Sequence, residues 1–189
     1  MLDVHILSIA DRKGRQFSRC LDSVERAAKA APFPVGVHVI DNQSEGHIGL
    51  GRQAGYAMGT GKYVTNVDDD DWVEERAFSI LAPAMEMNAP AIYTSFHKHA
   101  PWGYSVQRGK KVLLRVFRRD ILEGFDFSLW PSMDGPAIVA HADRQGPSVM
   151  IDDPVYHYVL AQKSASSVIA AKNPQLAKQY KEMLEKGHG

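Results

Sequence analysis

The sequence predicts an α/β protein built as a three-layer sandwich around a mainly parallel sheet. Through the first half of the chain, short apolar, β-branched runs alternate with segments whose apolar residues recur at helical spacing. Polar residues directly follow these apolar runs. Such alternation is typical of β-α-β units, in which the strands pair in parallel and the helices cover the faces of the sheet.

The first half of the chain accounts for three expected strands and three expected helices. The strands are residues 4–10, 35–41 and 62–67. Each is apolar on both faces, as in strands buried inside a parallel sheet. The helices are residues 16–31, 50–59 and 73–87. Pro32 and Pro34 end the first helix, and Pro83 is expected to shorten or kink the third.

The second half predicts a more mixed arrangement. The expected strands are residues 91–99, 111–118, 147–152 and 154–159. The expected helices are a short one with a turn in 119–127, a longer one over 134–146, and an amphipathic C-terminal helix over 173–187. No repeat or linker interrupts the chain, so we expect one compact domain over residues 1–189.

Composition excludes several classes of protein without naming a partner. The 189 residues contain 22 basic and 22 acidic side chains, which argues against a dedicated nucleic-acid binder. A single cysteine, Cys20, rules out an intrachain disulfide and favours a reducing compartment. The N-terminal stretch does not have the pattern of a signal peptide, and no apolar run is long enough to span a bilayer. We therefore expect a cytoplasmic protein with no membrane partner.

Four consecutive aspartates, Asp68 to Asp71, follow the third expected strand. Neighbouring carboxylates repel each other by roughly 1 kcal/mol even in water. Ligands of open α/β sheets bind beyond the carboxyl ends of the strands, and a hard divalent cation bound there would relieve the repulsion. The alternative is a solvated acidic helix N-terminus, which the helix dipole favours.

The surrounding residues are similar to those of a known family. A strand ending in Asp41 is followed by "GLGRQAGYAMGTGKYVTNVDDDD", and later by "LLRVFRRDILEGFDFS" and "SMDGPAIVAHADRQGPSVMIDDPVYHYVLAQKSASS". In this order the segments resemble the family 2 glycosyltransferases of the GT-A fold. The resemblance implies a Rossmann-like α/β/α sandwich with a mainly parallel mixed sheet. It also implies a nucleotide-sugar-binding half, residues 1–88, and an acceptor-side half, residues 89–189.

The resemblance implies an enzyme, a hexosyltransferase, that uses a nucleotide-diphosphate sugar, with UDP as the expected nucleotide. Asp41 would hydrogen-bond the base, with Asp11 assisting it. Arg52 would face the base or the pyrophosphate. From the residues alone, the two aspartates can also serve as loop caps, and the arginine can form a surface ion pair.

The aspartate run matches the DxD motif of the family. Asp68 would contact the ribose, and Asp70 would bind Mn²⁺ or Mg²⁺, which bridges the diphosphate. Because four aspartates are adjacent, the register stays open, and Asp69 and Asp71 are alternatives for these two roles.

Later segments supply the catalytic expectation and two departures. Asp134 matches the aspartate of the family's "ED" pair and would be the general base of an inverting transfer, or otherwise a helix N-cap. Val159 and Ala161 stand where the family has Arg and His. His157 is therefore the replacement metal ligand that we expect, and Lys163 can offer a charge to the diphosphate.

The acceptor is the least defined part of the interpretation. A glycan or another soluble acceptor is expected. The cations of 108–119, beside Trp102 and Tyr104, keep a phage-type enzyme that modifies hydroxymethylated DNA bases as an alternative. A non-catalytic nucleotide-sugar-binding domain is a third reading. His97 and His99 share one face of an expected strand, but two histidines are too few for a zinc site.

Overall fold

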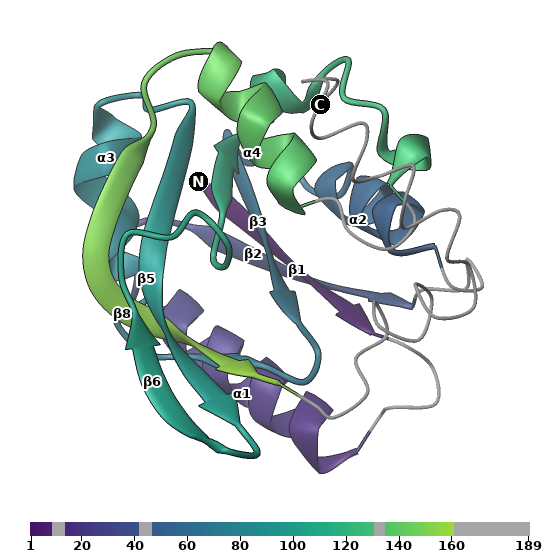
Figure 1. Cartoon of the computed structure of the whole chain (residues 1–189). Helices are drawn as coiled ribbons and strands as arrows, with labels where there is room; N and C mark the ends of the chain where they lie inside the picture. Colours follow the sequence, from purple (N-terminus) through teal and green to yellow (C-terminus); the bar gives the residue numbers. More distant parts are fainter. Residues whose placement is uncertain (9–13, 42–46, 131–134, 161–189) are drawn as a thin grey trace.

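The computed structural model describes residues 1–8, 14–41, 47–130 and 135–160, and it confirms the α/β class (Figure 1). Eight strands form one mixed sheet in the order β2-β1-β3-β7-β5-β8-β4, with β6 paired to β5. The strands are β1 Leu2–Ser8, β2 Val35–Asp41, β3 Tyr63–Asp68, β4 Trp72–Val73, β5 Ala91–Ala100, β6 Gly103–Gln107, β7 Val116–Arg118 and β8 Val149–Val159.

The first three strands and the first two helices fold as the alternating pattern predicts. Strand β1 lies between β2 and β3, runs parallel to both, and is buried along its whole length. Helices α1 (Arg15–Ala30) and α2 (Ile48–Tyr56) begin and end within three residues of the expected bounds. Burial on both faces explains why β1 lacks a polar face in the sequence.

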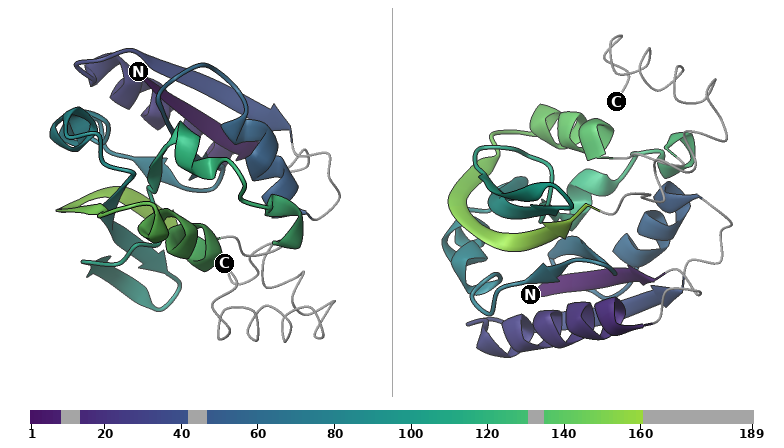
Figure 2. Two further views of the ribbon diagram at one scale, coloured as in Figure 1. Left: turned by 90° about the horizontal axis from the view of Figure 1, so that it is seen from above. Right: turned by 60° about the horizontal axis from the view of Figure 1, so that its bottom comes forward.

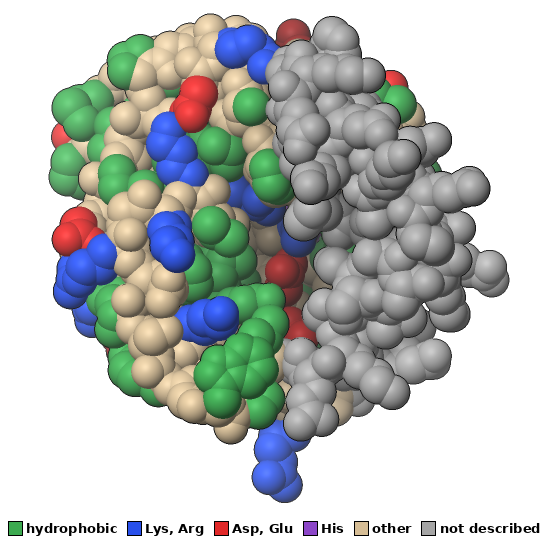
Figure 3. Space-filling view, viewed as in Figure 1, with side chains coloured by type: hydrophobic (Ala, Val, Ile, Leu, Met, Phe, Trp, Pro, Cys, Tyr) green, Lys and Arg blue, Asp and Glu red, His purple; other side chains and the backbone are tan. Residues whose placement is uncertain are grey.

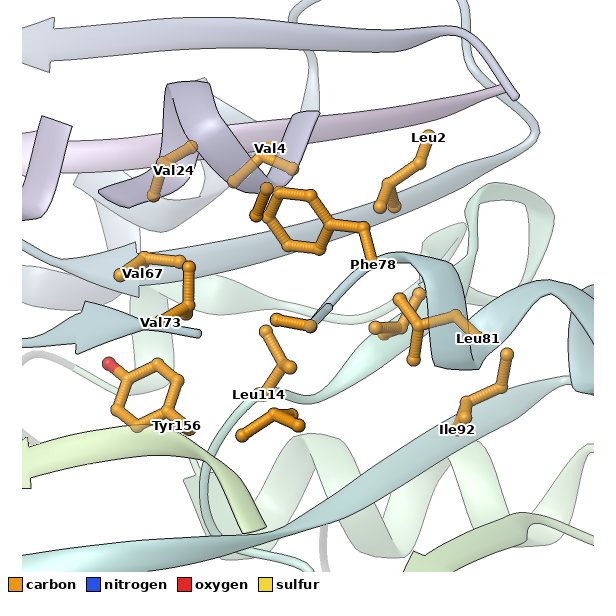
Figure 4. Close-up of a cluster of buried hydrophobic side chains, with 14 of the residues drawn as sticks. Leu2, Val4, Val24, Val67, Val73, Phe78, Leu81, Ile92, Leu114 and Tyr156 are labelled. Carbon is orange, nitrogen blue, oxygen red and sulfur yellow. The ribbon is translucent and has the colours of Figure 1, made fainter. Parts of the chain in front are cut away.

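Helices cover both faces of this sheet. Helix α1 packs on one face, whereas α2 and α4 (Gly135–Arg144) pack on the other (Figure 2). Alternate residues of β1 serve the two layers: Leu2 and Val4 enter the core under α1, and His5 packs edge-on against Tyr56 of α2. Figure 4 shows the α1-side core, in which Phe78 and Leu81 lie among these strand residues.

The third expected helix is wrong for most of its length. Trp72–Val73 pair with β8 as strand β4, and the chain then turns into a 3₁₀ segment, Ser79–Leu81, and a short helix α3, Ala82–Glu86. Pro83 stands in the first turn of α3, where its missing N–H costs nothing. Strand pairing with a distant segment therefore overrides the helical spacing of residues 73–81.

In the second half of the chain, the strands differ from the predicted ones in two places. The expected strand 111–118 shrinks to β7, and the expected strands 147–152 and 154–159 are one bulged strand, β8. A bulge near Pro154 lets the strand continue past a residue that cannot donate a ladder hydrogen bond. Short 3₁₀ turns follow β7, at Arg119–Leu122 and Phe127–Leu129. The expected C-terminal helix, residues 173–187, lies outside the described residues.

Within the described ranges, no helix is both long and apolar enough to cross a membrane.

Candidate functional site

The candidate site lies at the carboxyl edge of β1, β2 and β3. The strand registers place Ser8 beside Asp41, and Leu7 beside Asp68, so all three strands end at this edge. Asp41 is exposed and Asp68 is half-buried. Figure 3 shows acidic and basic side chains close together in a hollow of the surface. The fold therefore brings predicted donor-binding residues from separate segments to the position where open α/β sheets bind ligands.

Arg52 and Asp68 form an ion pair at this edge. Nη2 of Arg52 lies 2.9 Å from Oδ1 of Asp68, and the arginine side chain is 8% exposed. Burial raises the pKa of Asp68, but the charge and hydrogen bond of Arg52, with the charge of Arg115, outweigh it and hold that pKa below its usual value. Asn66 donates a second hydrogen bond to the same carboxylate oxygen. Asp68 is therefore held ionised and in a fixed orientation.

Asp71, by contrast, is buried and bonded inside the protein. Its carboxylate accepts a hydrogen bond of 2.7 Å from the hydroxyl of Tyr156 and one of 2.8 Å from the backbone N–H of Val159. Burial, reinforced by the charges of Asp68 and Asp70, raises the pKa of Asp71 well above its ordinary value. Asp71 therefore joins the end of β8 to the aspartate turn and faces the interior rather than a ligand.

The other two aspartates differ in exposure. Asp69 is buried, whereas Asp70 is half-buried. The backbone carbonyl of Asp70 accepts a hydrogen bond from Arg19, whose guanidinium also lies 3.7 Å from the ring centroid of Trp72. Arginine side chains from three different segments therefore surround the turn and offset part of its negative charge.

The glycines of the quoted motif have a structural function at Asp3. The carboxylate of Asp3 is buried, accepts a 2.6 Å hydrogen bond from the N–H of Gly61, and pairs with Arg119. A Cβ on Gly59, whose φ is +73°, would come within 2.3 Å of that carboxylate. Close approach of backbone to a buried acid therefore requires glycine in this segment.

His157 lies in a different group of side chains from the aspartates. Its ring stacks on Trp72, with centroids 4.6 Å apart, and its Nε2 lies 3.4 Å from Glu74. His97 and His99 of β5 complete the group. Burial and the charge of His97 lower the pKa of His157 to about 4, against the raising effect of Glu74. His157 is therefore neutral at pH 7.

The basic segment 108–119 is mostly engaged within the protein. Ion pairs join Arg108 to Asp152, Lys111 to Asp143, Arg118 to Asp120, and Arg119 to Asp3. Arg115 is buried near the aspartate turn, as its effect on Asp68 indicates. Trp102 and Tyr104 are exposed. Four of these cations thus have an acidic partner within the chain, largely at the surface, which neutralises part of the charge that this segment offers to a polyanion.

Three residues with expected roles lie outside the described residues: Asp11, Asp134 and Lys163. The roles assigned to these residues, and the division of the chain into donor and acceptor halves, stay predictions.

Several residues around the site escaped the sequence interpretation. Asn66 orients Asp68 by a hydrogen bond. Tyr156 donates to Asp71 and accepts a 3.2 Å hydrogen bond from the N–H of Asp68. Glu74 lies beside two of the histidines. Asn66 carries a local signal, because it stands two residues before Asp68 on the same face of β3. Tyr156 and Glu74 carry none, because their roles depend on the pairing of β4 with β8.

The fold and the carboxyl-edge site together define a GT-A type domain. A sequence model described as glycosyl transferase family 2 matches residues 19–152, which is well over half of the chain. The chain therefore belongs to glycosyl transferase family 2. No curated protein matches the sequence.

Solved structures of S. aureus TarS share the fold at low sequence identity. TarS 1-349 in complex with UDP-GlcNAc is 14% identical, with a TM-score of 0.68, and the match covers 88% of this chain and 60% of that one. TarS 1-349 in complex with UDP is 13% identical in sequence, with a TM-score of 0.64, and the match covers 85% of this chain and 60% of that one. A longer TarS chain is 14% identical in sequence, with a TM-score of 0.65, and the match covers 84% of this chain and 36% of that one. The chain thus spans between 36% and 60% of the length of these TarS chains.

Proposed function

We propose that the protein is a metal-dependent, inverting glycosyltransferase that moves a hexosyl group from a UDP-sugar to an acceptor hydroxyl. The observation that carries the proposal is the Arg52–Asp68 ion pair at the carboxyl edge of the sheet, beside Asp41, in a chain of glycosyl transferase family 2. The choice of UDP is supported by the TarS structures, which share the fold and are complexes with UDP-GlcNAc and UDP.

The donor would bind across the ends of β1 to β3. Asp41, exposed at the end of β2, accepts hydrogen bonds from the base, with Asp11 assisting. Asp68, kept ionised by Arg52, accepts a hydrogen bond from the ribose. Arg52 thus serves mainly to orient Asp68, and its positive charge also favours the pyrophosphate.

The aspartate turn suits a hard divalent cation. Its donor set consists of carboxylate oxygens, which Mn²⁺ and Mg²⁺ prefer, and Asp70 is partly exposed where Asp71 is not. Asp70 is therefore the metal ligand that we propose, with Asp69 as the neighbouring donor-site residue. When bound, the cation stabilises the negative charge that develops on the departing nucleoside diphosphate.

Asp134 would act as the general base. It would remove the proton from the acceptor hydroxyl while that oxygen attacks the anomeric carbon from the side opposite the leaving group, which inverts the configuration. This role rests on the match of Asp134 to the family motif.

The acceptor we propose is a glycan or another soluble acceptor. The alternative, a hydroxymethylated DNA base, relies on the 108–119 segment, most of whose cations have an acidic partner within the chain. The remaining alternative, a non-catalytic nucleotide-sugar-binding domain, differs from both in one respect, because it binds donor without consuming it.

Donor turnover separates these functions. Purified protein is incubated with a panel of UDP-sugars in Mn²⁺, Mg²⁺ or EDTA, and release of UDP is measured with glycans, with hydroxymethylated DNA, or with water alone as acceptor. We expect cation-dependent release that Asp134→Ala abolishes while UDP binding is retained. Binding without release in any arm would establish the non-catalytic alternative, and release with DNA alone would establish the other.

A further inference from the structure

Three potential metal ligands converge where β4, β8 and β5 lie side by side in the sheet. Glu74 follows β4, His97 lies on β5 and His157 lies on β8. One ligand atom of each lies within 4.8 Å of the others, and all three side chains are half-buried. Among the residues that the structure describes, this is the only group of three or more such side chains, and it includes none of the four aspartates.

The distances from Glu74 to the two imidazoles fit a tetrahedral ion. Oε1 of Glu74 lies 3.5 Å from Nε2 of His97 and 3.4 Å from Nε2 of His157. Zinc binds imidazole nitrogen and carboxylate oxygen at about 2.0–2.2 Å, so two ligands at a tetrahedral angle are roughly 3.3–3.5 Å apart. The two distances from Glu74 therefore fit one ion, whereas the rings of His97 and His157, stacked with centroids 4.3 Å apart and planes at 17°, have to turn before both Nε2 atoms point at it.

The second nitrogen of each imidazole ring already has a partner. Nδ1 of His97 hydrogen-bonds the hydroxyl of Tyr104, and Nδ1 of His157 lies 3.0 Å from Nε2 of His99. Metal-bound histidines commonly use the other ring nitrogen in this way, which fixes the tautomer and the orientation of the ring. These partners fix the orientation of both rings, and the Nε2 atom of each ring lies on the side of Glu74.

One contact has to change when an ion binds. Nε2 of His97 also lies 2.9 Å from the backbone carbonyl of Pro154, a contact that requires a proton on that nitrogen. Binding would move the proton to Nδ1, which then donates to Tyr104. This change of tautomer is a direct signature of metal at His97.

We propose that Glu74, His97 and His157 form a transition-metal site that takes Zn²⁺, separate from the donor-site cation. The two sites differ in chemistry, since two imidazoles and one carboxylate suit zinc, whereas a turn of carboxylates suits Mg²⁺ or Mn²⁺. Because its ligands come from β5, β8 and the residue that follows β4, the ion would hold these three strands together. Trp72, which pairs with His157 and directly follows Asp71, links the site to the aspartate turn.

Zinc binding to the untagged full chain tests the proposal. After removal of metal with EDTA, Zn²⁺ is titrated in competition with a chromophoric chelator, and Co²⁺ serves as a spectroscopic probe of coordination. We expect one tight site per chain, four-coordinate Co²⁺ bands, and a melting temperature raised by roughly 5–10 °C at a hundredfold excess of Zn²⁺ over its dissociation constant.

Matched variants assign the site. Glu74→Gln, His97→Ala and His157→Ala should each weaken zinc binding more than tenfold, whereas His38→Gln, also on a strand but outside the group, and Asp70→Asn should leave the affinity unchanged. In the NMR spectrum of the wild-type protein, zinc should move the His97 proton from Nε2 to Nδ1. If His157→Ala does not fold, the isosteric Glu74→Gln decides.

Three results would overturn the site: absence of a tight zinc site in the wild-type chain, zinc affinity that survives Glu74→Gln and His97→Ala, or zinc affinity that Asp70→Asn removes. Each can occur whether or not the protein transfers sugars, so the test is independent of the proposed function.

Discussion

The two ends of the aspartate turn should respond differently to the same substitution. Asp71→Ala removes the acceptor of two hydrogen bonds, from the hydroxyl of Tyr156 at 2.7 Å and the N–H of Val159 at 2.8 Å. Asp70→Ala removes a carboxylate that is partly exposed to solvent. We therefore expect the first variant to lose stability and the second to lose function.

The magnitude follows from the buried donors. The hydroxyl of Tyr156 is buried and the N–H of Val159 is partly buried, and a buried donor without an acceptor costs about 1–3 kcal/mol, so the two together cost roughly 2–6 kcal/mol at most. Removing one of several neighbouring negative charges returns about 1 kcal/mol. Asp71→Ala should thus lower the free energy of unfolding by about 1–5 kcal/mol, whereas Asp70→Ala should change it by less than about 0.5 kcal/mol.

The pH dependence gives a second signature. Because the pKa of Asp71 in the folded protein is raised above 3.8, the folded chain holds this proton more tightly than the unfolded chain. The contribution of this proton to the free energy of unfolding is fully present below about pH 4 and is lost as pH rises through the pKa of Asp71 in the folded protein. Asp71→Asn, which does not titrate, should lack this part of the loss.

Urea unfolding followed by circular dichroism measures both effects, with the slope of the transition checked to confirm that only stability changes. A stability of Asp71→Ala equal to that of Asp70→Ala would contradict a structural role of Asp71, and so would an Asp71→Asn variant with the wild-type dependence of stability on pH between 4 and 8.

Three further substitutions test other contacts. Arg52→Ala should weaken UDP binding about tenfold to a hundredfold in calorimetry, because Asp68 loses a charged hydrogen bond; unchanged affinity would contradict its role. Burial, followed by the charge of Arg52, lowers the pKa of His5 to about 3, so the free energy of unfolding should fall as pH drops below about 6.5. His5→Gln has no group that titrates at this position, so its urea midpoint should fall less over the same pH range. Gly59→Ala should destabilise the protein by about 1–3 kcal/mol, because the new Cβ would meet the carboxylate of Asp3. Gly109→Ala should cost less, because Gly109 has a similar positive φ but no atom within 4 Å of the new Cβ. Equal urea midpoints for the two variants would contradict the close approach at Gly59.

The parts of the fold that the sequence predicted correctly depend on local patterns. The first three strands and the helices α1 and α2 are set by apolar runs, helical spacing and terminating prolines or glycines, all within a few residues. The end of β3 at Asp68 follows in the same way, so the carboxyl edge could be predicted before the structure was known.

The errors and omissions depend on contacts between distant segments. The helix expected over 73–87 yields to the pairing of β4 with β8, and the same pairing brings Glu74 to His157 and Tyr156 to Asp71. Nothing near residue 71 shows that one of four identical side chains is buried. Separating the aspartates by role therefore required the structure.

The most direct test of the central claim is the affinity of the protein for UDP, measured by calorimetry in Mn²⁺ and again in EDTA, for the wild type and for Asp70→Asn. We predict that Mn²⁺ strengthens binding of UDP to the wild type at least about tenfold, and that the variant loses this difference while keeping the fold. Equal affinity of the wild type in Mn²⁺ and EDTA, or an undiminished effect of Mn²⁺ in Asp70→Asn, would contradict a metal-assisted donor site at the aspartate turn.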